Sequence, residues 1–314
     1  MATSHRKTQK LHDTLGRRRR DTATSRGELV RITPRDLLWF EALHRHGPLP
    51  LPYLHAFTHA SNASYHASTR RAATLFHEGY LTRPHQQFAT LDARCQTLVY
   101  DLSGRSKEEL RRNNLRRQYA PKPSPSHWRH DFMVACITAS IEISTAGTGC
   151  GYIHRDEILN RNGTTLSFDV SSVASGRDAL LRPDSIFGIR YPSGRARLVV
   201  VEADCGTEVL AARGWRKSIE RNAGQYRAFI GERRYREALG TDAGILLLYA
   251  TTSPRRMSNL IDVWRATHDG KCPYAIFACL PEFVRYFKPP QILTRLFTAP
   301  YERIAVEPFH LDAE

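Results

Sequence analysis

The sequence predicts a mixed α/β (α+β) protein, with a small helical domain in front of a larger domain built on a sheet. Short apolar stripes at helical spacing occupy residues 32–78. Apolar runs of strand length alternate with helical stretches between residues 130 and 278. A proline-rich stretch at 121–126 separates the two regions, and 314 residues are enough to bury two cores.

The charge of the chain is strongly positive, with 46 Lys and Arg against 31 Asp and Glu and a formal net charge of +15. This excess favours a polyanionic partner, because each phosphate that is neutralised releases condensed counterions. We therefore expect double-stranded DNA as the partner. Since no apolar run approaches roughly 18 residues and the basic N-terminus lacks the apolar core of a signal peptide, we expect no membrane partner and a cytoplasmic protein associated with the nucleoid or a plasmid.

Two further classes of ligand are not expected from the sequence. The six cysteines are scattered without a C-x-x-C pair, which argues against a zinc site or a disulfide framework. The motif G-x-x-x-x-G-K-[ST] does not occur, so we expect no nucleotide cofactor.

The first 31 residues are rich in arginine and include the run from Arg17 to Arg20. No apolar periodicity supports a packed helix in this segment. We therefore predict that residues 1–31 are a disordered basic arm that touches DNA phosphates. The alternative is a tail that only aids solubility.

Residues 32–102 are predicted to contain three helices followed by two strands. Thr33 and Pro34 have the residue types of a helix start, and Gly47 ends that first helix. The other elements are expected over two helical ranges, 50–57 and 63–78, and two strand ranges, 80–83 and 96–102. This order resembles the winged helix-turn-helix domain, in which the strands form the wing.

In a winged helix the third helix enters the major groove, and its exposed side chains touch bases or phosphates. The candidates for these DNA contacts are Ser64, His66, Ser68, Thr69, Arg70 and Arg71. One alternative is that the two arginines only form a solvated face. Another is that the domain serves as a dimer or protein contact, which leaves a homodimer open.

Residues 103–126 are predicted to link the two domains. A strongly basic helix is expected from Ser106 to Gln118, followed by a semi-rigid linker with three prolines. The arginines of this helix are candidates for contacts with the DNA backbone: Arg111, Arg112, Arg116 and Arg117. A soluble spacer without a DNA contact is the alternative.

The back domain, residues 127–314, is predicted to be a mixed sheet flanked by helices. The expected helices cover residues 130–143, 211–231 and 255–267, and the expected strands cover residues 166–170, 185–191, 197–203, 244–249 and 274–278. Pro192-Ser193-Gly194 predicts a hairpin turn between two of these strands.

Three carboxylates gather at this hairpin. Asp184 opens one strand, and Glu202 and Asp204 close the next, where side chains two apart share a face. Neighbouring carboxylates repel one another unless a cation joins them, and oxygen ligands select Mg²⁺ or Mn²⁺. Such a metal ion can activate water and stabilise charge on a scissile phosphate. The alternatives are that Asp184 caps a turn and that Glu202 pairs with Arg182 or Arg197.

The pattern P-D, about eighteen residues and then E-x-D at the end of an apolar strand resembles the PD-(D/E)xK nuclease superfamily. More narrowly, the segments RPDSIFGIRYPSGRARLVVVEADCGTEVL and SIERNAGQY resemble the bacterial replication-relaxation family, over roughly residues 32–250. The resemblance implies a winged helix joined to a PD-(D/E)xK nuclease-like domain, in a protein of plasmids and other mobile elements.

Carried over to this sequence, the resemblance implies that Asp184 and Glu202 are metal ligands. Asp204 is expected as a third ligand, at the position where classical members keep a catalytic lysine. Glu208 and Tyr226 match the trailing glutamate and the tyrosine of the following helix. The lysine expected four residues before that tyrosine is replaced by Asn222, while Lys217 on the same predicted helix could reach the site and is a further catalytic candidate.

Two functions follow from these observations. The first is a Mg²⁺- or Mn²⁺-dependent DNA endonuclease or nickase of a mobile element. The second is a replication initiator or transcriptional regulator that binds DNA and whose nuclease fold is catalytically silent, as the missing lysine favours. An interaction scaffold with incidental charge is the third alternative.

Overall fold

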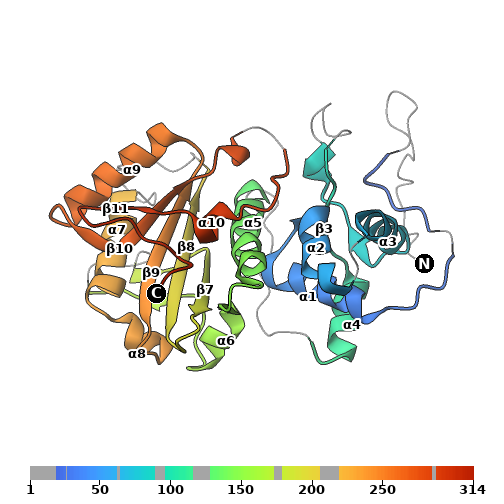
Figure 1. Ribbon diagram of the computed structural model, residues 1–314, viewed down its shortest axis with the longest axis horizontal. Coiled ribbons are helices and arrows are strands. Elements are labelled where there is room, and N and C mark those ends of the chain that lie inside the picture. The colour runs from blue at the N-terminus through green and yellow to red at the C-terminus, as the bar shows by residue number, and fades with distance from the viewer. Residues whose placement is uncertain are drawn as a thin grey trace, which may run out of the picture.

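The computed structural model describes residues 19–25, 27–61, 64–88, 96–115, 128–172, 179–205, 219–284 and 288–314. It is a mixed α/β protein, as predicted. Figure 1 shows a helical front part at one end of the long axis and a sheet with its helices at the other. Helix α5 (Trp128–Thr145) stands between them.

The front part contains three helices and a small sheet. Its elements are α1 (Pro34–His46), β1 (Leu49–Pro50), α2 (Leu51–Phe57), the 3₁₀ turn η1 (His59–Ser61), α3 (Tyr65–His77), β2 (Leu81–Thr82), the 3₁₀ turn η2 (His85–Phe88) and β3 (Val99–Leu102). The strands form an antiparallel sheet in the order β1-β3-β2. This arrangement is compatible with a winged helix. The two-residue strand β1 and the 3₁₀ turns η1 and η2 were not expected, because they are too short to show a period.

The predicted ends of the first helix are confirmed. Thr33 accepts a hydrogen bond from the backbone of Asp36, whose carboxylate in turn accepts one from the backbone of Thr33. This reciprocal capping box satisfies two amide groups that a helix start leaves unpaired. At the other end Gly47 has φ 102°, a backbone conformation that favours glycine and so stops the helix.

The predicted basic helix is shorter than expected. Helix α4 covers Gly104–Arg112, with Ser103 as its N-cap. Its end differs from the predicted Gln118 because Asn114 has φ 55°, a left-handed conformation that asparagine tolerates better than most residues. The rest of the predicted helix, including Arg116 and Arg117, and all of the proline-rich linker at 121–126 lie outside the described residues.

The back part is a six-stranded sheet with helices on both faces. After α5 its elements are β4 (Gly151–Ile153), α6 (Arg155–Asn160), β5 (Phe168–Asp169), β6 (Leu180–Leu181), β7 (Ser185–Arg190), β8 (Ala196–Asp204), α7 (Ile219–Tyr226), the π-helical turn η6 (Arg227–Gly231), α8 (Tyr235–Leu239), β9 (Gly244–Thr251), α9 (Pro254–Thr267), β10 (Cys272–Cys279), the 3₁₀ turn η7 (Pro281–Phe283), α10 (Arg295–Thr298) and β11 (Glu302–Ile304). Strands β5 and β6 form a separate small hairpin.

The large sheet has the order β11-β10-β9-β8-β7-β4. Its middle strands β8, β9 and β10 are parallel, and the strands outside them run antiparallel to their neighbours. The predicted hairpin between β7 and β8 is confirmed, with Gly194 in its turn at φ 86°. Seven consecutive residues of β8 are buried, as expected of a central strand with both faces covered.

The two faces of the sheet pack against different helices. Val199 and Val201 of β8 belong to the hydrophobic cluster that contains Met133 and Ile137 of α5. The alternate residues of β8 belong instead to a second cluster with the apolar residues of α7 and α9. In Figure 1 these two helices lie on the side of the sheet away from the front part.

The front and back parts share one hydrophobic cluster through α5. Trp39 of α1 and Tyr53 of α2, both fully buried, belong to the same cluster as Met133. The hydroxyl of Ser140 donates to the hydroxyl oxygen of Tyr53 over 3.1 Å. The front part is therefore packed onto the sheet domain by α5, while the domain boundaries proposed from the sequence stay predictions.

Candidate functional site

Asp184 lies directly before β7 and faces the end of β8. Its backbone amide donates to the carbonyl of Val201, which extends the ladder by one residue and places Asp184 opposite Glu202. Its carboxylate oxygen Oδ2 accepts a hydrogen bond of 2.8 Å from the backbone amide of Ala203. The expected approach of Asp184 to the end of its partner strand is therefore seen in the structure.

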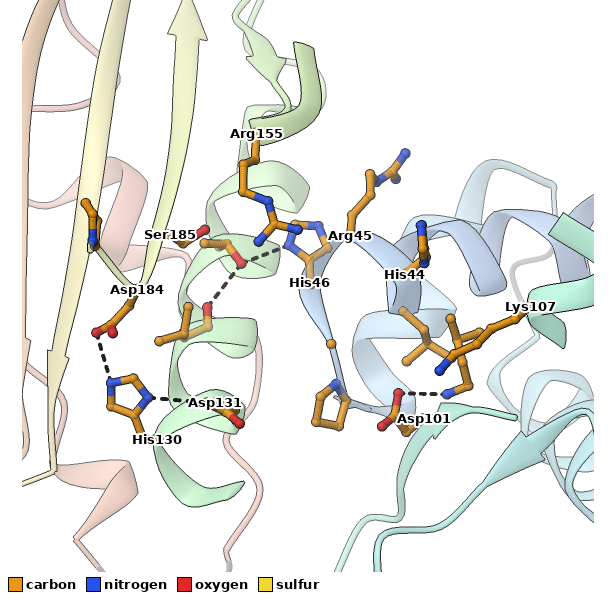
Figure 2. A pocket seen from close by; sticks show the side chains of 17 residues that line it. His44, Arg45, His46, Asp101, Lys107, His130, Asp131, Arg155, Asp184 and Ser185 are labelled. Atoms are coloured by element: carbon orange, nitrogen blue, oxygen red, sulfur yellow. Dashed lines mark hydrogen bonds and ion pairs between the residues drawn. The ribbon is translucent and has the colours of Figure 1, made fainter. Parts of the chain in front are cut away.

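The same oxygen of Asp184 lies 2.9 Å from Nε2 of His130, on α5 (Figure 2). Burial alone would lower the pKa of His130, but hydrogen bonds to Asp131 and Asp184, together with the charge of Asp184, raise it to about 11. The imidazole is therefore a cation at neutral pH, and it forms an ion pair with Asp184. The sequence contains no local signal for this pair, because the two residues lie 54 positions apart.

Glu202 is 4% exposed and faces α7. Its oxygen Oε1 accepts a hydrogen bond of 2.6 Å from the hydroxyl of Tyr226 and one of 3.4 Å from the side-chain amide of Asn222. Residues four apart on a helix share a face, so both donors point at β8. Burial and the charge of Glu202 hold the pKa of Tyr226 well above its usual range, which keeps the hydroxyl a donor.

Asp204 is 1% exposed and pairs with a cation that the sequence analysis did not single out. Its oxygen Oδ2 lies 2.6 Å from Nε of Arg256, in the first turn of α9. The turn begins at the N-cap Ser253, followed by Pro254, a residue pair typical of a helix start. Lys217 and Glu208, the other residues that we expected near Asp204, lie outside the described residues.

Glu202 and Asp204 do share one face of β8, as predicted, because their partners come from α7 and α9 on the same side of the sheet. Asp184 is bonded to α5 on the other side. The carboxylates are therefore grouped at one end of the hairpin, but each faces a different donor. In the described part of the chain, no three His, Cys, Asp or Glu side chains are arranged to hold a metal ion. As they stand, these residues do not fit Mg²⁺ or Mn²⁺.

A cavity of about 250 Å³ opens beside Asp184, between the front part and the sheet. Asp184, His130 and Ser185 lie on one wall, and Asp101 and Lys107 come from the front part (Figure 2). Burial raises the pKa of Asp101 to about 6, although its bond from the Leu102 amide and the charge of Lys107 oppose the shift. Segments far apart in the sequence line this cavity, so no motif could have indicated it.

The predicted DNA-reading helix, α3, exposes Ser64, His66, Thr69 and Arg70. Tyr65, which we did not single out, is 44% exposed beside them. Ser64 is also the N-cap of the helix and accepts a hydrogen bond from the amide of Ala67. These residues form an outward-facing polar surface, called here the α3 face.

Two of the expected DNA-contact residues do not belong to this face. Ser68 is completely buried, and its hydroxyl is hydrogen-bonded to Nδ1 of His55 on α2, so its predicted exposure is wrong. Arg71 points toward α1, where its guanidinium bonds the buried carboxylate of Asp36 at 3.0 and 2.6 Å. Arg71 therefore holds α3 against α1, because its partner Asp36 lies in the first turn of α1.

The arginines of α4 are on the surface. Arg111 and Arg112 are 62% and 64% exposed, and they pair with Glu108 and Glu109 one turn earlier on the same helix. Ion pairs as exposed as these are weak, so both guanidinium groups can exchange partners at little cost.

The fold and the site together define a class: a mixed α/β protein in which a helical head of winged-helix order is packed on a sheet that carries grouped carboxylates. The model of the replication-relaxation family matches residues 40–243, and the chain belongs to that family. No curated protein and no solved structure matches the chain. Within the part of the chain that the structure describes, no helix is long and apolar enough to cross a membrane.

Proposed function

We propose that the chain is a duplex-DNA-binding protein that acts in the replication of a plasmid or other mobile element, and that its nuclease-like domain does not cut DNA. Its family supports a role connected with replication. The net charge of +15 and the exposed α3 face support a polyanionic partner. In winged-helix proteins the corresponding helix lies in the major groove.

One observation carries the proposal of a silent nuclease domain: each carboxylate already has a donor from the protein itself. The cation at Asp184 is His130, the cation at Asp204 is Arg256, and Glu202 accepts from Tyr226. A divalent ion would have to displace two short ion pairs, one of them with a carboxylate that is 1% exposed. Such ions bind oxygen ligands. Here the oxygens of Asp184 and Asp204 are already paired with positively charged side chains, which would repel a divalent cation.

A metal-dependent endonuclease or nickase is the second candidate. The observation that favours it is the grouping of Asp184, Glu202 and Asp204 at one end of the β7–β8 hairpin. In that case these three residues would hold Mg²⁺ or Mn²⁺, and the ion would supply charge stabilisation at a phosphate. The side chains of His130 and Arg256 would first have to turn away.

The experiment uses the full chain and a supercoiled plasmid that carries the DNA flanking the gene of this protein. Duplex binding is measured first, with the double variant His66→Ala and Arg70→Ala on the α3 face compared with Arg161→Ala, an exposed arginine of the back part. We expect the α3 variant to bind more weakly and Arg161→Ala to bind like the unaltered chain. Equal affinities for all three proteins would contradict DNA binding through α3.

The plasmid is then incubated with Mg²⁺ or Mn²⁺, with Asp184→Ala and Glu202→Ala as companion variants. We expect the unaltered chain to bind the plasmid and leave it supercoiled. Metal-dependent nicking that both substitutions abolish would establish the second candidate instead.

A further inference from the structure

The segment that precedes the first helix is attached to α3. The backbone amide of Thr24 donates to Nδ1 of His77 over 3.2 Å, and the hydroxyl of Ser25 donates to Oε2 of Glu78 over 2.7 Å. His77 is the last residue of α3, and Glu78 is its C-cap. Thr24 and Ser25, which belong to the predicted basic arm, are therefore bonded to the end of α3 in the structure.

A second attachment holds the segment five residues earlier. The guanidinium of Arg83, just after β2, donates to the carbonyl of Arg20 over 2.9 Å. Arg83 is itself fixed, because it lies 3.9 Å from the centre of the Phe76 ring and also bonds the hydroxyl of Tyr100. Thr22, between the two attachments, is 9% exposed. Residues 19–25 are thus bound at both ends to the front part.

The attachment lies at one end of the α3 face. His77 follows Arg70 by seven residues, two helical turns, so the two side chains lie on the same side of α3. The segment therefore passes the C-terminal end of the surface proposed to read DNA, and Figure 1 shows the N-terminal chain running beside α3. Residues 19–25 contain no helix or strand, and the single chain bends at residues 20–22.

Resting on the duplex binding proposed above, we propose that Arg19 and Arg20 enter the minor groove beside the stretch of major groove that α3 occupies. The minor groove is about 6 Å wide, which is too narrow for a helix but admits arginine side chains from a single chain. The negative potential of a narrow minor groove attracts arginine in particular. In the free protein Arg19 pairs with Asp21 through two bonds of 3.0 and 2.5 Å and stays 36% exposed, so the groove replaces Asp21 as its partner.

The first test measures the salt dependence of duplex binding for the full chain and for the double variant Arg19→Gln and Arg20→Gln. Loss of two phosphate-neutralising charges makes the negative slope of log K against log salt shallower by about 1.8. Over a fourfold change in salt, the binding constants of the two proteins therefore change by amounts that differ about 12-fold. The matched control is Arg161→Gln with Arg190→Gln, which removes the same charge from the back part and leaves the slope unchanged.

The second test separates the minor groove from the phosphates. Two duplexes of the same sequence are compared, one with G·C pairs and one with inosine·cytosine pairs, which lack the minor-groove amino group and keep the same major-groove hydrogen-bonding atoms. We expect the unaltered chain to prefer the inosine duplex and the Arg19/Arg20 variant to lose this preference. The inference would be overturned if the Arg19/Arg20 variant had the same salt slope as the unaltered chain. It would also be overturned if the unaltered chain showed no preference for the inosine duplex, or if the variant kept that preference. In each case duplex binding itself would still stand.

The attachment is tested with Ser25→Ala, which removes the bond to Glu78 and keeps both arginines. We expect this variant to bind DNA but to show a smaller preference for the inosine duplex. A preference equal to that of the unaltered chain would show that the attachment does not position the arginines. If the unaltered chain binds no duplex at all, the proposed function falls, and this inference falls with it.

Discussion

Nε2 of His46 lies 2.6 Å from Oε2 of Glu142, and this contact joins the last residue of α1 to the last turn of α5. The other ring nitrogen of His46 is hydrogen-bonded to the hydroxyl of Thr138, one turn earlier on α5. Arg45 adds an ion pair to Glu142 at 3.2 Å. The head that carries the α3 face is therefore held to the sheet domain by polar contacts as well as by the shared hydrophobic cluster.

The Glu142 contacts predict a loss of stability in acid. Burial alone would raise the pKa of Glu142, but the bond from His46 and the charges of His46 and Arg45 lower it to about 2. Burial lowers the pKa of His46 itself below 6.5, so the charge on His46 also develops only as the pH falls. Folding lowers the pKa of Glu142 from its ordinary value of 4.5. The ionised carboxylate therefore stabilises the fold above pH 4.5, and this contribution is lost as the pH falls from 4.5 toward 2. We expect a decline of about 3 kcal/mol in the free energy of unfolding.

Glu142→Gln should flatten this decline, with urea unfolding as the measurement. The matched control is Glu157→Gln, whose partners Arg161 and Arg190 are exposed and whose pairs are therefore worth little. If Glu142→Gln and Glu157→Gln unfold with the same pH dependence, the His46–Glu142 contact does not stabilise the protein.

Asp101, in the wall of the cavity, predicts a pH dependence of stability opposite to that of Glu142. Here the free energy of unfolding falls as the pH rises, and it does so in a higher pH range. The pKa of Asp101 rises on folding from 3.8 to about 6, so its contribution to stability is fully present below 3.8 and is lost as the pH rises through about 6. Asp101→Asn removes the charge of this carboxylate. We expect this variant to be more stable than the unaltered chain by up to about 3 kcal/mol at neutral pH and equal to it in acid. Urea unfolding at both pH values checks this, and a variant that is less stable at neutral pH would contradict it.

The ion pair between Arg256 and Asp204 predicts a large effect on stability. Arg256→Leu leaves a carboxylate that is 1% exposed without its guanidinium, which typically costs about 3–5 kcal/mol. Arg265→Leu on the same helix is the control, because its pair with Asp262 is half exposed and is worth at most about 1 kcal/mol. Chemical denaturation of both variants measures the difference, and similar losses would show that the Asp204 pair is not a buried charge pair in solution.

Tyr226→Phe tests the hydrogen bond to Glu202 without changing charge or much volume. Removal of a buried donor to a charged acceptor should cost about 1–3 kcal/mol in the free energy of unfolding. Tyr65→Phe, at a tyrosine that is 44% exposed, should be close to neutral. If Tyr226→Phe leaves the free energy of unfolding unchanged, Glu202 has an equivalent donor or ligand in solution. A metal ion at this position would then have to be tested.

Local sequence signals were enough for the elements whose causes are local. The capping residue Thr33, the stop at Gly47 and the turn at Gly194 act through their own backbone geometry, so their positions could be read directly. The face shared by Glu202 and Asp204 follows in the same way from the twofold period of a strand. The replication-relaxation resemblance also depended on contiguous segments, and the family match over residues 40–243 confirms it.

What the sequence by itself determined was therefore the order of the longer helices and strands, the family and the grouping of the carboxylates at one hairpin. Only the tertiary structure decided which donors those carboxylates meet, because His130 and Arg256 reach them from positions 54 and 52 residues away. It also turned Ser68 inward and Arg71 toward Asp36, since a helix buries whichever side meets its neighbours. Periodicity predicts that a helix has a buried side, but the choice of partners depends on packing between elements that are distant in the chain.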